Sequence, residues 1–238
     1  MSRPEFDEYA ANYDEIRKQS LGYLGKDLDY YARAKSRLVR KMIGGTVGSV
    51  LEFGCGIGSN VAQLRLAFPQ AIIAGCDLSL ESLSIARANN PGVHFFSLSE
   101  EPPIKGGFDV VVVPNVLHHV VPDERDRVID TIYEMVQPGG SIIVFEHNPY
   151  NPLVRRVVKN CPLDRNAVLL PMAESLSLVR SRFTLSAHGY TTFFPPLVSH
   201  LASLEPWLAW LPLGGQYYVR GIRGQQCTAM DSTWGNKS

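Results

Sequence analysis

The sequence has no excess of either charge, and this absence limits the partners that we expect. Lysine and arginine number 23 among the 238 residues, and aspartate and glutamate also number 23, so the formal net charge is zero. Dedicated nucleic-acid-binding domains usually carry a clear basic excess, so we expect no nucleic-acid partner. Hydrophobic residues make up 45% of the chain, which excludes a wholly disordered protein.

Cysteine is scarce, and long apolar runs are absent. The four cysteines are Cys55, Cys76, Cys161 and Cys227. They form no CxxC pair, which excludes a zinc ribbon or a thioredoxin motif, and we expect free thiols and no metal site. The residues before Ile16 are acidic and polar, unlike a secretory signal. No run of about 18 uncharged apolar residues marks a membrane-spanning helix, so we expect a cytoplasmic protein.

Short apolar runs alternate with amphipathic segments through the middle of the chain. The runs that have the character of buried strands are 50–53, 71–76, 93–96, 108–113 and 141–145. The segments between them that have helical apolar spacing include 60–68, 81–88 and 123–136. Strands that alternate with helices predict βαβ units and a parallel sheet.

The two ends of the chain have a different character. Residues 1–44 predict an N-terminal helical segment or lid, and residues 45–238 predict the main domain. Tyr9 and Tyr13 either close over the ligand or, more simply, pack within the core or the lid. Later in the chain we expect a helix near 173–187, strands near 190–194 and 216–220, an apolar insertion at 195–215 and a polar C-terminal tail.

The most informative segment is Leu51-Glu-Phe-Gly-Cys-Gly-Ile-Gly-Ser-Asn60, which follows a predicted strand and opens a predicted helix. A dinucleotide fingerprint of the form G-x-G-x-x-G needs a glycine at position 59, where this chain has Ser59. The third glycine is instead Gly58, and Glu52 precedes the first glycine by two positions. A carboxylate there suits a cationic ligand better than a pyrophosphate, which argues against a dehydrogenase.

Polar residues follow three further predicted strands. Asp77 ends the second strand, where an acid can accept hydrogen bonds from both hydroxyls of a ribose. Asn115 follows the buried run at 108–113, and Glu146 and His147 follow the run at 141–145. The carboxyl ends of parallel strands meet at one edge of a sheet, so these residues are expected on the ligand-binding rim.

These four segments, in this order and spacing, resemble the class I S-adenosylmethionine-dependent methyltransferases, in particular the small-molecule, type 11-like group that includes quinone-biosynthesis enzymes. The resemblance covers residues 45–146 most strongly. It implies an α/β fold with a doubly wound, seven-stranded Rossmann-like sheet in the order 3-2-1-4-5-7-6, with strand 7 antiparallel and helices on both faces. It also implies S-adenosylmethionine as cofactor and S-adenosylhomocysteine as product.

The resemblance assigns cofactor contacts to particular positions. Glu52 is expected near the ammonium group, the loop of Gly54, Cys55, Gly56 and Gly58 under the methionine part, Asp77 on the ribose, Leu78 on the adenine and Asn115 near the sulfonium. Many relatives also carry an acid after strand 3 that binds the adenine amino group. Leu98 falls nearest that place here, and Ser97, Ser99 or a backbone group would have to replace the acid.

The expected reaction is methyl transfer to an O, N or C nucleophile of a small molecule, which includes lipophilic or lipid-linked acceptors. The alternative is a catalytically silent cofactor-binding protein of the same fold. If the acceptor must lose a proton, the candidate bases are, in falling order, His147, His119, His118 and Glu146. Adjacent helical residues point about 100° apart, so His118 and His119 are not expected to serve one site.

Two further features each leave several interpretations open. The basic residues Arg155, Arg156, Lys159 and Arg165 could meet a phosphate or carboxylate of the substrate, an anionic membrane face, or only solvent. The apolar insertion, which contains Trp207 and Trp210, could contact a lipophilic substrate or a membrane peripherally, pack on the sheet, or form a dimer interface. The sequence does not indicate an oligomeric state.

Overall fold

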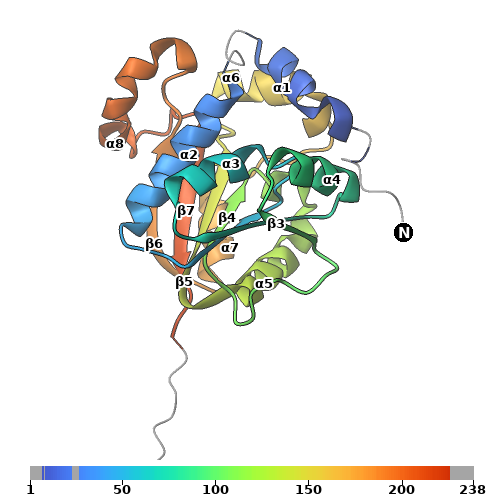
Figure 1. The fold of residues 1–238 in the computed structure, drawn as a ribbon. Helices are drawn as coiled ribbons and strands as arrows, with labels where there is room; N and C mark the ends of the chain where they lie inside the picture. The colour runs from blue at the N-terminus through green and yellow to red at the C-terminus, as the bar shows by residue number, and fades with distance from the viewer. Residues whose placement is uncertain (1–6, 8, 23–26, 226–238) are drawn as a thin grey trace, which may run out of the picture.

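The computed structural model describes residue 7 and residues 9–22 and 27–225, and these form a mixed sheet in the order β3-β2-β1-β4-β5-β7-β6 (Figure 1). The strands are β1 (Ser49–Phe53), β2 (Ile72–Asp77), β3 (His94–Ser97), β4 (Phe108–Pro114), β5 (Val136–His147), β6 (Thr184–Thr191) and β7 (Gln216–Ile222). Strands β1 to β5 pair in parallel, and β7 runs antiparallel between β5 and β6. The predicted fold class and strand order are confirmed.

Helices cover both faces of this sheet. The α-helices are α1 (Tyr13–Leu21), α2 (Leu28–Ile43), α3 (Ser59–Ala67), α4 (Leu80–Asn89), α5 (Arg125–Met135), α6 (Pro152–Asn160), α7 (Met172–Arg180) and α8 (Glu205–Leu208). The 3₁₀ helices are η2 (Ala10–Asn12), η4 (Leu117–His119), η5 (Pro122–Glu124), η6 (Pro162–Asp164) and η7 (Pro196–Leu204). Buried residues of α2, α3 and α4 pack on one face, and those of α5 and α7 pack on the other.

Strand β4 shows why the sheet has a core on each side. Val110 and Val112 belong to the cluster beneath α2 and α3, whereas Val111 and Val113 belong to the cluster beneath α5. All four side chains are buried. Successive side chains of a strand point to opposite faces of the sheet. When both faces are covered, every residue of the strand is buried, and its sequence is therefore an unbroken run of apolar residues.

One predicted boundary is wrong. The sequence predicts a helix to residue 187 and a strand from 190, but α7 ends at Arg180 and β6 already begins at Thr184. Residues 184–188 alternate between exposed and half-buried positions, which is the period of a strand with one solvated face. This short edge strand carries small and polar residues, so its weak alternation is easily taken for the end of a helix. The last strand, predicted at 216–220, is confirmed as β7.

The N-terminal elements cross the edge at which the parallel strands end. Helix η2 packs on α4, and α1 packs on α6 (Figure 1). The Ser79 hydroxyl, just after β2, donates a hydrogen bond of 2.6 Å to Asp7 Oδ1. The segment therefore spans the rim from one side to the other, which is the position that a lid requires.

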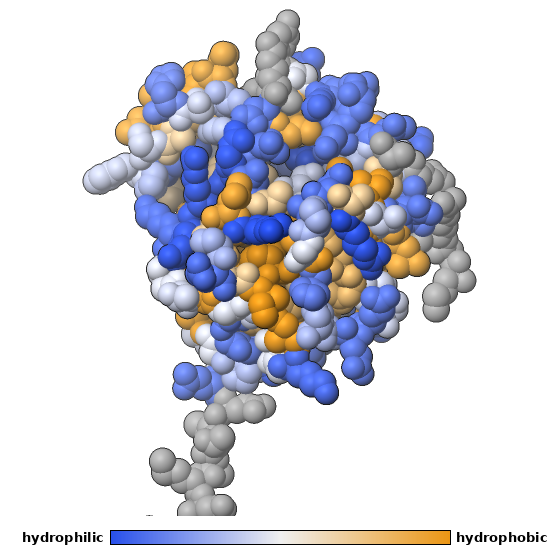
Figure 2. Space-filling model, in the orientation of Figure 1, coloured by the Kyte–Doolittle hydropathy of each residue, from blue (hydrophilic) through white to orange (hydrophobic). Residues whose placement is uncertain are grey.

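The apolar insertion lies between β6 and β7 and forms η7 and α8. Several of its large side chains are exposed, including Leu197 at 89%, Trp207 at 80% and Trp210 at 76%. Figure 2 shows hydrophobic residues at the upper left of the molecule, where η7 and α8 project in Figure 1. No helix among the described residues is long and apolar enough to cross a membrane.

The cysteine prediction is confirmed where the structure describes it, since Cys55, Cys76 and Cys161 are free and buried. Cys227 lies outside the described residues, as does the predicted polar tail from position 226.

Arg125 is a buried cation that joins two loops behind the sheet rim. Its side chain is 2% exposed. The guanidinium donates hydrogen bonds to the carbonyls of Leu117 (3.1 Å) and Val168 (2.6 Å) and pairs with Glu174. These contacts hold the loop after β4 against the segment that precedes α7.

We expect Arg125→Met to lower the free energy of unfolding by about 3 kcal/mol, because buried carbonyls lose their donor. Urea denaturation measures this change. Arg127, on the same helix, is 79% exposed, and Arg127→Met is the matched control, with an expected effect of about 0.5 kcal/mol or less. Equal effects of the two substitutions would contradict a structural role for Arg125.

Candidate functional site

The glycine-rich loop after β1 is open on one side only. Gly54, Gly56 and Gly58 have φ values of 70°, 52° and 82°, which disfavour any residue with a side chain. A Cβ on Gly54 would lie 2.5 Å from Val116 Cγ2, and one on Gly58 would lie 2.6 Å from Asn90 Nδ2. A Cβ on Gly56 would meet no atom within 4 Å. Gly56 therefore marks the open side of the loop, where a ligand can approach the backbone.

Asp77 joins this loop to the end of β2. One carboxylate oxygen accepts a hydrogen bond from Gly56 N at 2.8 Å, and the other accepts one from Ser79 N at 2.9 Å. Burial raises the pKa of Asp77 above its usual value, although these backbone N–H groups oppose the rise. The carboxylate therefore lies beside the open face of the loop.

Glu52 is a fully buried acid at the end of β1. Its Oε1 accepts a hydrogen bond from Asn60 Nδ2 at 2.8 Å, whereas its Oε2 has no hydrogen-bond partner. Burial raises the pKa of Glu52 to about 8, against the lowering effects of Asn60 and the nearby Lys35. A buried carboxylate oxygen without a donor suits a ligand that brings a cationic donor of its own.

The other expected contacts follow neighbouring strands. Leu78 is 67% exposed directly after Asp77, and Leu98 N donates a hydrogen bond of 3.2 Å to the Asp77 carbonyl. Ser97 Oγ and Ser99 Oγ lie 3.0 Å apart. The segment after β3 thus flanks Asp77, but the Leu98 side chain packs against the core.

Two of the predicted cofactor-contact residues have side chains that interact with other parts of the protein. The Cys55 side chain is buried in the core cluster beneath α3 and α4, so only its backbone faces the loop. Asn115 has a positive φ of 58° at the end of β4, and its Oδ1 accepts a hydrogen bond from Gln216 Nε2 at 2.7 Å. Asn115 therefore links β4 to β7 at the rim.

A second cluster of polar side chains lies at the ends of β4 and β5. Glu146 is fully buried, and its Oε2 lies 2.5 Å from His118 Nδ1. Its Oε1 accepts a hydrogen bond from Leu117 N at 2.7 Å. One carboxylate thus fixes both the backbone and the first histidine of η4.

Asp164 completes this cluster from the other side. Its Oδ1 lies 3.5 Å from His118 Nε2 and 3.5 Å from His119 Nε2. The expectation that the two adjacent histidines cannot share a site is therefore wrong. They lie on a single 3₁₀ turn, where Glu146 holds the ring of His118 inward and the ring of His119 lies beside it, with centroids 4.1 Å apart.

The three histidines of the cluster differ in charge. Burial alone would lower the pKa of His118, but Glu146 and Asp164 overcome this effect and raise it to about 9. Burial, together with the charged His118, lowers the pKa of His119 to about 4 and that of His147 to about 3. At neutral pH His118 is therefore an imidazolium between two carboxylates, and the other two rings are neutral.

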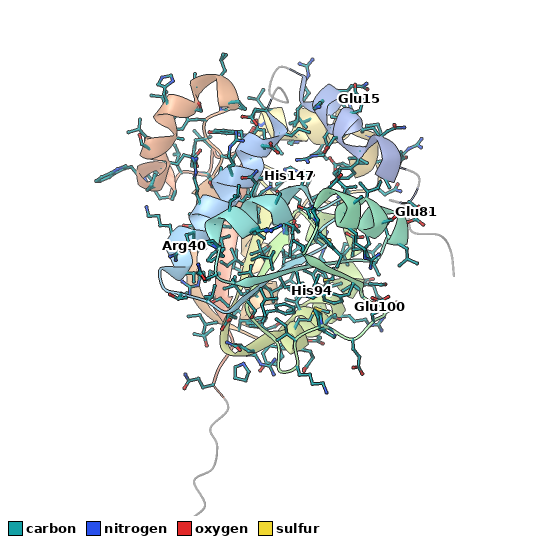
Figure 3. The ribbon with its side chains drawn as sticks, viewed as in Figure 1. Glu15, Arg40, Glu81, His94, Glu100 and His147 are labelled. Carbon is teal, nitrogen blue, oxygen red and sulfur yellow. The ribbon has the colours of Figure 1, made fainter. Side chains whose placement is uncertain are left out.

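Their positions change the predicted order of the candidate bases. Figure 3 shows His147 near α2. Its side chain is half-buried, and its Nδ1 is a buried atom with no hydrogen-bond partner among the residues that the structure describes. His118 and Glu146 are occupied with each other. His119 is 22% exposed and its Nε2 lies 3.5 Å from Asp164 Oδ1, so it is the candidate base that combines access for a ligand with a neighbouring carboxylate.

Sequence reasoning missed two members of the site. Asp164 ends the 3₁₀ turn η6, which no periodicity or spacing relative to the strands marks. Lys35 is buried on α2, and burial lowers its pKa to about 8. Tyr13, one of the two tyrosines considered for the lid, is half-buried. Its partial burial raises its pKa, and the charges of Asp164 and Asp77 add to the rise.

Comparison with known proteins shows which protein family the domain around this rim resembles. Residues 51–142 match a family model described as a methyltransferase domain. The match runs from β1 into β5 and includes the glycine-rich loop, Asp77 and Asn115. Residues 51–142 are therefore similar to a methyltransferase domain, and the strand order is that of the Rossmann-like methyltransferase fold.

The curated relatives of this chain are distant. An uncharacterized methyltransferase of Bacillus cytotoxicus is 28% identical over 145 residues, which cover 58% of this chain and 63% of that protein. Human tRNA N(3)-cytidine methyltransferase METTL2B is 27% identical over 129 residues, 49% of this chain and 34% of that protein. The trans-aconitate 2-methyltransferase of Deinococcus radiodurans is 33% identical over 95 residues, 40% of this chain and 36% of that protein. The matches thus span from about a third to under two thirds of these relatives.

Solved structures share the fold. A possible histamine N-methyltransferase of Thermotoga maritima superposes with a TM-score of 0.62 at 20% identity, over 92% of this chain and 98% of that one. The magnesium protoporphyrin IX methyltransferase of Synechocystis, solved with bound S-adenosylmethionine, has a TM-score of 0.58 at 15% identity, over 92% and 94% of the two chains. At these identities the likeness shows the fold alone.

The residues present fit S-adenosylmethionine, the cofactor of this methyltransferase domain. Glu52 offers its unpartnered buried oxygen to a cationic ammonium group, and Gly56 leaves open space above the loop. Asp77 sits where a ribose hydroxyl can donate to its remaining lone pairs. We propose that Glu52, Gly56 and Asp77 hold the cofactor.

Removal of the Asp77 carboxylate tests this assignment. We expect Asp77→Ala to weaken binding of S-adenosylmethionine by about 1–3 kcal/mol, because charge-assisted hydrogen bonds to the ribose are lost. Isothermal titration calorimetry measures the change, and Asp130→Ala, at a half-exposed position on α5, is the control. Wild-type affinity in a folded Asp77→Ala variant would show that the ribose lies elsewhere.

The raised pKa of Glu52 predicts a pH dependence of binding. A cationic ligand favours the ionised carboxylate and so lowers its pKa on binding. Because the free site has a pKa of about 8, affinity should increase as the pH rises towards 8 and then level off, and binding at pH 7 should release a proton. Calorimetry in buffers of different ionisation enthalpy measures this release. Glu52→Gln should abolish it, and an unchanged release in that variant would assign the proton to another group.

Proposed function

We propose that this protein methylates a hydroxyl group of a small molecule, with His119 as the general base. The observation that carries the proposal is the neutral, partly exposed ring of His119 next to the Asp164 carboxylate. A neutral amine attacks through its own lone pair, whereas a hydroxyl must lose its proton as the new bond forms. A neutral base backed by a carboxylate is therefore most useful for an oxygen acceptor.

When bound, S-adenosylmethionine supplies an activated methyl group, whose bond to sulfur breaks, with the electron pair left on sulfur, as the acceptor oxygen bonds to the carbon. His119 takes the hydroxyl proton, and Asp164, 3.5 Å from its Nε2, stabilises the imidazolium that forms. The low pKa of His119 does not prevent this transfer. An oxygen that is gaining a methyl group becomes a far stronger acid than such an imidazolium.

The surrounding residues position this base and limit access of water. Glu146 fixes η4 through Leu117 N and His118 Nδ1, and Val168 N donates a hydrogen bond of 2.8 Å to the His118 carbonyl. The N-terminal segment crosses the rim, and its Tyr13 is half-buried there. Alignment and exclusion of water are the main contributions that a protein makes to this displacement.

A divalent cation is a competing occupant of the same cluster. One atom each of His118, His119 and Asp164 can be chosen so that all three lie within 4.8 Å of one another. The raised pKa of His118 argues against this occupant, because a ring protonated on both nitrogens has no lone pair for a metal. Methyl transfer should therefore be unaffected by prior dialysis against EDTA.

The names of the relatives do not agree on an acceptor, since they include a tRNA cytidine and trans-aconitate. The acceptor is therefore sought directly. We expect the protein to transfer tritiated methyl from S-adenosylmethionine to a small molecule in an extract of its host. Label in RNA would overturn the small-molecule assignment, and bound cofactor without any labelled product would favour a catalytically silent protein.

The role of His119 is tested by kinetic assays that use the fraction of the extract in which the methylated small molecule is found. His119→Asn should lower kcat about 10²–10⁴-fold, as expected for the loss of a general base, and leave the affinity for S-adenosylmethionine unchanged. His200→Asn, on exposed residue 200 of η7, is the control. An unchanged kcat in His119→Asn would rule out its role as base.

A further inference from the structure

A hollow of about 890 Å³ lies between α6, the loop that follows it and Tyr9. In Figure 1, α6 lies beside α1 at the same end of the molecule as the rim of the sheet. Apolar residues contribute part of the wall, among them Pro152, Val158 and Leu169. The hollow is separate from the glycine-rich loop that we assign to the cofactor.

The charged residues that line this hollow are mostly cations. They are Arg155, Arg156, Lys159 and Arg165, with Asp164 as the one acid among the described lining residues. None of the four cations forms an ion pair with another residue that the structure describes. Like charges gathered without partners repel one another, so this arrangement is stabilised by a bound anion.

The local helix geometry concentrates this charge. Positions 155, 156 and 159 of α6 fall within about 100° of one another around the helix axis, and all three residues are exposed. The buried Val158 lies about 60° from Arg155 around the helix axis, so α6 presents both apolar and basic residues to the hollow. Guanidinium groups present planar forks that match the oxygens of a phosphate, and the lysine adds a point charge.

Asp164 connects the hollow to the proposed reaction centre. Its side chain lines the hollow, and its Oδ1 lies 3.5 Å from His119 Nε2. The hollow and the histidine cluster therefore share a wall. An acceptor anchored by its anionic group on α6 could present a neighbouring hydroxyl towards His119.

We propose that this hollow binds the phosphate group of a small phosphorylated acceptor. The proposal rests on the proposed methyl transfer and names the class of its substrate. Four cations in one hollow match the multiple charge of a phosphate ester or diphosphate better than a single carboxylate. The chain as a whole is neutral and the cations gather in one hollow, which favours a small ligand over an RNA backbone.

The binding part is tested without any methyl transfer. Inorganic pyrophosphate is titrated by calorimetry into the full chain saturated with S-adenosylhomocysteine. We expect saturable binding of one equivalent, weakened at least tenfold in the triple variant Arg155→Gln, Arg156→Gln, Lys159→Gln. The charge-matched control replaces Arg127, Arg180 and Arg182, which are exposed on or just after α5 and α7, and should bind like the wild type.

Several outcomes would overturn the proposal. These are the absence of saturable binding, an equal loss in the control variant, equally tight binding of citrate, or displacement of pyrophosphate by bulk tRNA at lower concentration. Because the substituted residues are exposed, circular dichroism should show an unchanged fold. Binding of S-adenosylhomocysteine is measured in the same experiment, so a failure of the cofactor assignment is distinguishable from a failure of the anion site.

The labelled product then shows whether the phosphate belongs to a soluble metabolite or to a lipid. Label that binds an anion-exchange resin and stays in water identifies a soluble phosphorylated metabolite. Label that binds the resin but extracts into organic solvent identifies a lipid phosphate, and gives the exposed apolar residues near α6, such as Leu153 and Leu213, a role in holding its chain. Label on an uncharged product contradicts the proposal.

Discussion

The buried contact between Glu146 and His118 is the interaction on which the acceptor side of this rim depends. Glu146 lies near the end of the interior strand β5 and holds both Leu117 N and the ring of His118. Desolvation of two charges offsets much of their attraction, so such a pair contributes little net stability. Its consequence is geometric, because it fixes one orientation of the loop after β4 and thereby places His119 beside Asp164.

The same contact sets the charge of the neighbouring rings. His118 remains protonated because two carboxylates flank it, and its positive charge helps keep His119 and His147 neutral. Of the three histidines in the cluster, only His118 is therefore positively charged. The positive ring therefore serves to position the loop, whereas a neutral ring beside a carboxylate can accept a proton.

The sequence predicts those parts of the molecule that depend on local patterns. The positions of the strands, the glycine-rich loop and the place of Asp77 follow from apolar runs and from the spacing of glycines, whereas the strand order is implied by the resemblance to class I methyltransferases. The contact between Asp164 and the adjacent histidines could not be predicted, because a proline-bounded turn far along the chain brings the carboxylate there. The boundary between α7 and β6 was missed because the pairing with β7, rather than the propensity of residues 184–188, decides that they form a strand.

A net charge of zero conceals an uneven distribution of charge around the rim. Glu52 and Asp77 make the end near β1 and β2 suitable for a cationic ligand, whereas the exposed cations of α6 make the opposite side suitable for an anion. The acidic side therefore favours the cationic cofactor, and the basic side favours the anionic acceptor. Neither ligand is attracted to the binding place of the other. An acceptor whose anionic group is held on α6 is oriented before reaction, so that its uncharged part is directed towards His119 and the end of β4. Such orientation is the main requirement for a displacement in which the methyl group is already activated.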